Sequence, residues 1–77
     1  MKYHAKLNIG RIPTDHNDLK GLWLSGYIYD DKHTHGLHPF NDGEYVYTTT
    51  VTRVVKRRGK VYVTTRNTTY LLISEPA

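Results

Sequence analysis

The sequence predicts one small all-β domain, and three observations lead to this expectation. The chain has 77 residues, which is enough for a single domain spanning residues 1–77. Residues 2–9 alternate strictly between apolar and polar side chains, which is the period of a half-buried strand. Residues 44–74 are rich in Val, Tyr and Thr and are interrupted by short turn sequences, which is typical of neighbouring strands.

The pattern predicts five strands, at residues 2–9, 22–29, 44–55, 60–65 and 69–74. The apolar parity slips between Tyr47 and Val54, which indicates a β-bulge near residues 48–50. We expect the last three strands to form a meander. We expect the whole chain to close into a five-stranded SH3-like or OB-like barrel, because closure removes exposed sheet edges.

The connections between these strands differ in length and character. Residues 10–20 and 30–43 contain turn-forming residues and are expected to be loops, and a loop as long as 30–43 is often functional. Residues 56–59 predict a tight hairpin turn in which Gly59 has a positive φ. Residues 66–68 predict a second turn.

Composition excludes several classes of protein. Cysteine is absent, so neither a disulfide nor a zinc-thiolate site is expected. No apolar run approaches the roughly 20 residues of a membrane span, and the polar, alternating N-terminus does not resemble a signal peptide. We therefore expect a cytoplasmic protein, in whatever cell makes it, with no membrane partner and no cofactor. Small folds of this kind gain stability by self-association, so a homo-oligomer is expected.

Charge is distributed unevenly along the chain. Residues 45–74 contain six cationic side chains and no acidic ones, whereas residues 1–44 are balanced. Two interpretations follow: a basic hairpin that keeps the protein soluble, or a surface that binds an anionic ligand or nucleic acid.

Catalysis and metal binding receive little support. The histidines of His33-x-His35-x-x-His38 could hold a metal if all three converged, but their spacing matches no established site. Asp30 and Asp31 are adjacent, so an extended chain points them to opposite faces. No spacing pairs a serine with an activating base. We therefore expect neither an enzyme nor a metal site.

Aromatic residues are abundant, with seven tyrosines, one tryptophan and one phenylalanine. A core this thin cannot bury all of them, although core and cross-strand packing accounts for some. Exposed rings beside Arg and Lys suit nucleotides, because bases stack on rings while cations hold phosphates.

Residues 38–51, HPFNDGEYVYTTTV, and 61–72, VYVTTRNTTYLL, resemble a widespread group of short phage and bacterial proteins. The shared pattern is a Pro-x-Phe-like loop, an Asp-Gly turn, a Val-x-Thr-Ser/Thr-x-Val strand and a closing Val-x-Thr-x-Asn/Ser-x-x-Tyr-x-Leu. It covers roughly residues 22–73 and departs in the His-rich insert before His38 and in Thr49-Thr50, where Thr-Ser is commoner. Some members look like viral anti-defence proteins that sequester cyclic nucleotide signals, as in evasion of CBASS immunity.

The resemblance implies a phage-type anti-defence protein that binds a cyclic oligonucleotide, such as a cyclic dinucleotide, without cleaving it. The candidate ligand-binding residues are Arg53, Lys60 and Arg66 for phosphates, Trp23, Tyr27 and Phe40 for stacking, Thr49, Thr50 and Asn67 for base edges, and His38 as a donor. Two alternatives remain: a nucleic-acid-binding module that uses the basic hairpin 53–60, and a protein–protein inhibitor of a host defence complex.

Overall fold

The computed structural model describes residues 2–32, 40–66 and 68–74. This part of the chain is all-β, as the sequence predicts, with six strands and one short 3₁₀ turn. The strands are β1 (Ala5–Asn8), β2 (Trp23–Tyr29), β3 (Glu44–Thr50), β4 (Arg53–Arg57), β5 (Lys60–Thr64) and β6 (Thr69–Ile73), and the turn is η1 (His16–Leu19). Among the described residues, no helix is long and apolar enough to cross a membrane.

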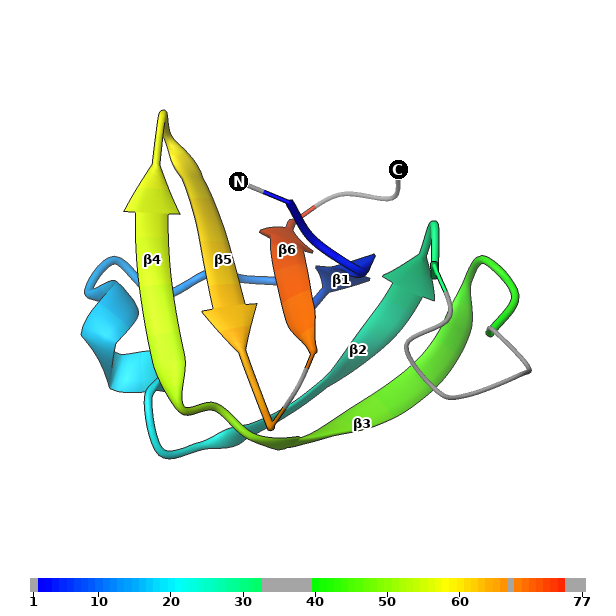
Figure 1. Ribbon diagram of the computed structural model, residues 1–77, viewed down its shortest axis with the longest axis horizontal. Helices are drawn as coiled ribbons and strands as arrows, with labels where there is room; N and C mark the ends of the chain where they lie inside the picture. The colour runs from blue at the N-terminus through cyan, green and yellow to red at the C-terminus, as the bar shows by residue number, and fades with distance from the viewer. Residues whose placement is uncertain (1, 33–39, 67, 75–77) are drawn as a thin grey trace.

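The six strands form one curved sheet in the order β3-β2-β1-β6-β5-β4 (Figure 1). β1 and β6 are parallel, and all other neighbours are antiparallel. β4, β5 and β6 form the expected meander. β3 and β4 are the two edges and are not hydrogen-bonded to each other, so the sheet stays open where the sequence predicted a closed, five-stranded barrel.

The sixth strand arises because the expected strand 44–55 is divided at residues 51–52. Val51 N donates to the Leu22 carbonyl at 2.7 Å, and Gly21 N donates to the Val51 carbonyl at 2.9 Å. These bonds hold the buried Val51 at a corner, after which the chain leaves β3 and begins β4 on the far edge. The expectation of one strand was wrong here because the corner depends on a contact with a distant segment.

The bulge predicted near residues 48–50 is confirmed. Trp23 lies opposite Thr50 and Ser25 lies opposite Tyr47, so Leu24 on β2 faces two residues on β3. At this point Leu24 N donates to the side-chain Oγ1 of Thr48 at 2.9 Å. The Thr48 hydroxyl in turn donates to the Thr49 carbonyl at 2.8 Å.

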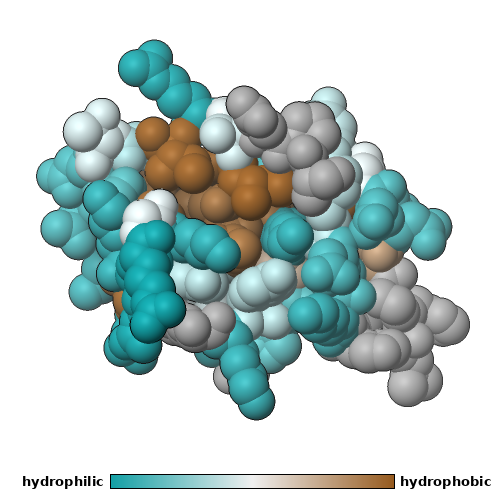
Figure 2. Space-filling view, turned by 90° about the horizontal axis from the view of Figure 1, so that it is seen from above, coloured by the Kyte–Doolittle hydropathy of each residue, from teal (hydrophilic) through white to brown (hydrophobic). Residues whose placement is uncertain are grey.

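The core lies inside the curve of the sheet. Its largest fully buried side chains are Leu7, Ile28, Val51, Val63 and Tyr70. Leu19 of η1 packs into the same cluster, so the segment expected to be only a loop contributes to the core. Figure 2 views the molecule from above and shows apolar residues that reach the surface in the middle of this face, with hydrophilic side chains around them.

Gly26 allows β1 and β2 to approach closely. A Cβ atom at this position would lie 2.1 Å from the Asn8 carbonyl oxygen, which is far inside van der Waals contact. Only glycine therefore fits in the middle of β2.

Candidate ligand-binding surface

Four aromatic side chains lie on the outer face of β2 and β3. Trp23 and Tyr27 come from β2, and Tyr45 and Tyr47 come from β3. Alternation along each strand places them opposite the buried Leu24, Gly26, Ile28, Val46 and Thr48. Their exposed fractions are 62% for Trp23, 49% for Tyr27, 52% for Tyr45 and 66% for Tyr47. We call these four residues the ring row.

The rings contact one another in sequence along the two strands. The ring centroids are 5.8 Å apart for Trp23 and Tyr47, 5.6 Å for Tyr47 and Tyr45, and 5.1 Å for Tyr45 and Tyr27. The interplanar angles of 55° to 85° are tilted or edge-to-face, which are the favourable arrangements for aromatic pairs. The rings therefore hold each other in place while keeping about half or more of each residue accessible.

A hollow of about 420 Å³ adjoins the Tyr27–Tyr45 end of the ring row. It is lined by Asn8, Ile9, Gly10, Ser25, Gly26, Tyr27, Tyr45 and Ser74. The Tyr45 hydroxyl donates to Ser25 Oγ at 2.9 Å, and Asn8 Oδ1 accepts from Gly10 N at 2.9 Å. The hollow thus presents hydroxyl and amide groups beside two rings, which suits a ligand with flat rings and hydrogen-bonding edges.

Two cations lie toward the other end of the row, where Trp23 is opposite Thr50. Shortly after Thr50, Thr52 N donates to the Thr64 carbonyl at 2.8 Å, which joins the end of β3 to the end of β5. Arg53 is opposite Thr64, and Arg66 follows two residues after it. The backbone therefore brings these two of the three predicted phosphate ligands to the Trp23 end of the row.

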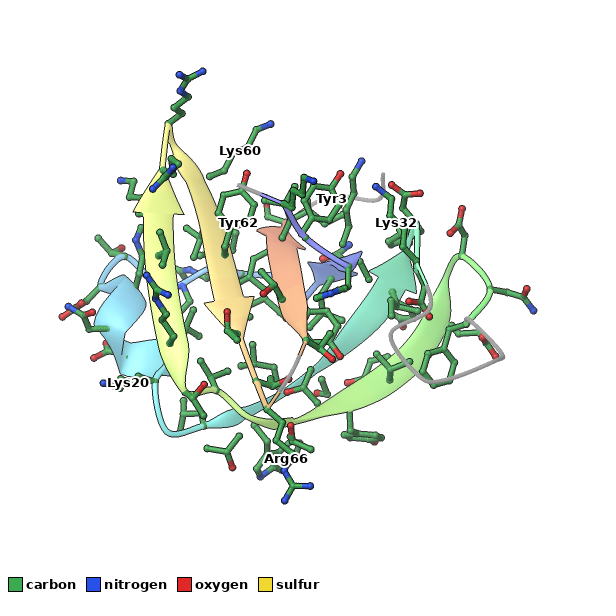
Figure 3. The ribbon with its side chains drawn as sticks, viewed as in Figure 1. Tyr3, Lys20, Lys32, Lys60, Tyr62 and Arg66 are labelled. Atoms are coloured by element: carbon green, nitrogen blue, oxygen red, sulfur yellow. The ribbon has the colours of Figure 1, made fainter. Side chains whose placement is uncertain are left out.

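Lys60, the third predicted phosphate ligand, lies elsewhere. Figure 3 shows Lys60 at the upper end of β5 and Arg66 at the lower side of the molecule. β5 spans Lys60–Thr64, so at about 3.3 Å per residue its two ends are about 13 Å apart, and Arg66 lies beyond the far end. The structure does not bring Lys60 together with Arg53 and Arg66.

The remaining predicted site residues have varied positions. Thr49 and Thr50 are exposed at the bulge. Phe40 is half-buried and packs against the core, and its amide donates to Asp31 Oδ2 at 2.7 Å. His38 and Asn67 lie outside the described residues, as do His33 and His35 of the histidine motif.

Tyr45 and Tyr47 belong to the aromatic excess of the sequence but are not among the ligand-binding residues that the sequence predicts. The signal was present in the sequence of β3, where they alternate with Val46 and Thr48. Since the partner strand has its own aromatic residues at Trp23 and Tyr27, two matching alternations predict one shared aromatic face.

Comparisons with protein-family models, curated proteins and solved structures find no match for this chain. The proposed function therefore rests on the chemistry of the described residues.

No group of three or more His, Cys, Asp or Glu side chains that could hold a metal ion occurs among residues 2–32, 40–66 and 68–74. Burial raises the pKa of the Tyr70 phenol, and the charge of Asp31 raises it further. Tyr70 is a core residue and does not belong to the ring row.

Proposed function

We propose that the protein binds and sequesters a cyclic oligonucleotide, such as a cyclic dinucleotide, and acts as a phage-type anti-defence protein. The observation that supports this proposal is the ring row. A base stacked on an aromatic side chain contributes about 1–3 kcal/mol, and four exposed rings in mutual contact offer several such positions. Because the rings already hold one another in place, binding costs little side-chain entropy.

The groups around the row complement the other parts of such a ligand. The hydroxyls of Ser25, Tyr27 and Tyr45 and the amide of Asn8 can hydrogen-bond to base edges or ribose hydroxyls. Arg53 and Arg66, at the Trp23 end, supply charge for phosphates. Thr49 and Thr50 are exposed near the same end and serve as further donors and acceptors.

Sequestration requires affinity and no turnover, and binding without cleavage is part of the proposal. Ser25 is the serine nearest the ring row, and its Oγ accepts a hydrogen bond from the Tyr45 hydroxyl. Among the described residues no histidine or carboxylate bonds to Ser25, so nothing there activates it as a nucleophile.

A homo-oligomer is part of the proposal. β3 is an edge strand, and it carries Tyr45 and Tyr47 on its outer face. A two-fold axis near this edge would join the rings of two copies, and a symmetric interface matches a ligand made of two similar halves.

The test begins with the purified protein. Heat denaturation followed by mass spectrometry would identify any nucleotide that copurifies. Calorimetric titration would then compare a cyclic dinucleotide with the linear dinucleotide of the same bases. We expect submicromolar binding of at least one cyclic ligand and weaker binding of its linear form. Micromolar or weaker binding of every cyclic oligonucleotide would defeat the proposal.

A further inference from the structure

The hairpin between β4 and β5 carries three cations around a second hollow. This hollow has a volume of about 390 Å³ and is lined by Arg57, Arg58, Lys60 and Tyr62. It belongs to the β4 edge of the sheet, whereas the ring row lies on β2 and β3 at the opposite edge. A ligand bound at the ring row would therefore not occupy this second hollow.

The turn of this hairpin contains an unfavourable backbone conformation. Arg58 has a φ of 52° and Gly59 a φ of 76°, so both central residues are left-handed, as a type I′ turn requires. Glycine suits the first of these positions because it has no Cβ to meet the following carbonyl oxygen, and asparagine and aspartate suit it because their short polar side chains hydrogen-bond locally. The chain nevertheless has arginine at the tip.

The side chains beside the turn add electrostatic repulsion. Arg57 and Lys60 are directly opposite each other in the ladder, and like charges in such a pair are destabilising. Within the described ranges, the side chains of Arg57, Arg58 and Lys60 make no hydrogen bond or ion pair. A strained arginine and an unneutralised cationic pair both lower the stability of the free protein, and a bound anion would relieve the repulsion.

Tyr62 gives the hollow a fixed wall. It lies two residues after Lys60 on the same face of β5, and only 6% of it is exposed. Its ring packs against Tyr3, with centroids 6.4 Å apart, and Lys32 Nζ lies 5.0 Å from the centre of the Tyr3 ring. Figure 3 shows Lys60, Tyr62 and Tyr3 on the same side of the molecule.

The chemistry of this site differs from that of the ring row. Its Tyr62 ring is buried and offers no face for stacking, so recognition depends on charge and on hydrogen-bond donors. Two guanidinium groups and an ammonium group are the donors that bind phosphate oxygens, and arginine does so with two parallel bonds. We propose that Arg57, Arg58, Lys60 and Tyr62 form a phosphate-binding site that is separate from the ring row.

Amide NMR spectra of the whole chain can test this site with pyrophosphate and with a short oligothymidylate as probes. Both probes contain phosphate groups. Comparing them shows whether the natural ligand of this site is a small phosphate compound or a nucleic-acid strand. We expect pyrophosphate to shift the amides of residues 57–62 and to leave those of the ring row unchanged. If the strand is the natural source, the oligothymidylate binds more tightly than pyrophosphate and weakens steeply between about 50 and 200 mM salt.

Two variants decide whether the site is local. Arg58→Gly removes the guanidinium and also relieves the strain of the positive φ at this position, so the protein should remain folded with an equal or higher Tm. Its affinity for pyrophosphate should fall about tenfold. Lys56→Ala removes one charge from the neighbouring part of β4 outside the hollow, and it should change affinity less than about twofold. Equal losses in the two variants would overturn the proposal, as would unchanged hairpin amides at about 10 mM pyrophosphate. Neither result depends on binding at the ring row, which cyclic dinucleotides test separately.

Discussion

The Thr48 hydroxyl accepts a hydrogen bond from Leu24 N at 2.9 Å at the point where β2 and β3 change register. Leu24 directly follows Trp23, and Thr48 directly follows Tyr47. The same hydroxyl donates to the Thr49 carbonyl, so one side chain satisfies two backbone groups at the bulge. The positions of Trp23 and Tyr47, whose rings touch across the strands, therefore depend on a buried threonine.

Replacing Thr48 by valine should lower the free energy of unfolding by about 1–3 kcal/mol, because the shape is retained while a buried Leu24 N–H loses its partner. Urea unfolding measures this loss. Thr49→Val is the matched control, since Thr49 is exposed and no bond of its side chain is present among the described residues. Equal losses in the two variants would show that the Thr48 bond does not stabilise the bulge.

Gly26→Ala should destabilise the fold by at least about 2 kcal/mol, because the added Cβ meets the Asn8 carbonyl and the backbone must shift. Thermal unfolding is the measurement. Ser25→Ala at the adjacent, outward-facing position should have a much smaller effect. A Gly26→Ala protein as stable as the wild type would mean that β1 and β2 are not in this close contact.

The stability of the protein should fall in alkaline solution partly through Tyr70. Its pKa is raised above 10 by burial and by the charge of Asp31, so in the folded state the phenol keeps its proton longer than in the unfolded chain. The native state then binds more protons, and its stability decreases as the pH rises above about 10. Urea unfolding at pH 8 to 11 should show a steeper decline for the wild type than for Tyr70→Phe. Parallel curves would contradict this assignment.

Tyr47→Ala should weaken binding of the proposed cyclic ligand by about 1–3 kcal/mol through loss of one stacking ring. Tyr47→Phe keeps the ring and should bind like the wild type. Because Tyr47 is 66% exposed, the fold should tolerate both changes, which circular dichroism can verify. Unchanged affinity in Tyr47→Ala, measured by calorimetry, would remove Tyr47 from the site.

Local patterns predicted much of the fold because they reflect local energetics. The alternation of residues 2–9, the bulge near Thr48 and the left-handed Gly59 all follow from side-chain parity or turn chemistry. The corner at Val51 and the parallel pairing of β1 with β6 depend on contacts between distant segments, which no local pattern encodes. The open sheet differs from the expected barrel for the same reason.

The candidate site was predicted only in part. An excess of rings over core volume indicated that some were exposed, and Trp23 and Tyr27 are among them. Lys60 begins β5 and Arg66 lies beyond its far end, so the length of this strand separates the two cations. The hollow at the hairpin could be found only in the structure. Composition reveals neither that Arg57 lies opposite Lys60 nor that Arg58 has a positive φ.

Trp23 is the sole tryptophan of the chain, so its fluorescence reports directly on the ring row. Titration with a cyclic dinucleotide should quench this emission in a saturable way, with a submicromolar midpoint that weakens at least about fivefold in Tyr47→Ala, as the loss of about 1–3 kcal/mol from one stacked base predicts. Emission that stays constant up to about 100 µM of every cyclic dinucleotide tested would contradict the proposal that bases stack on this row.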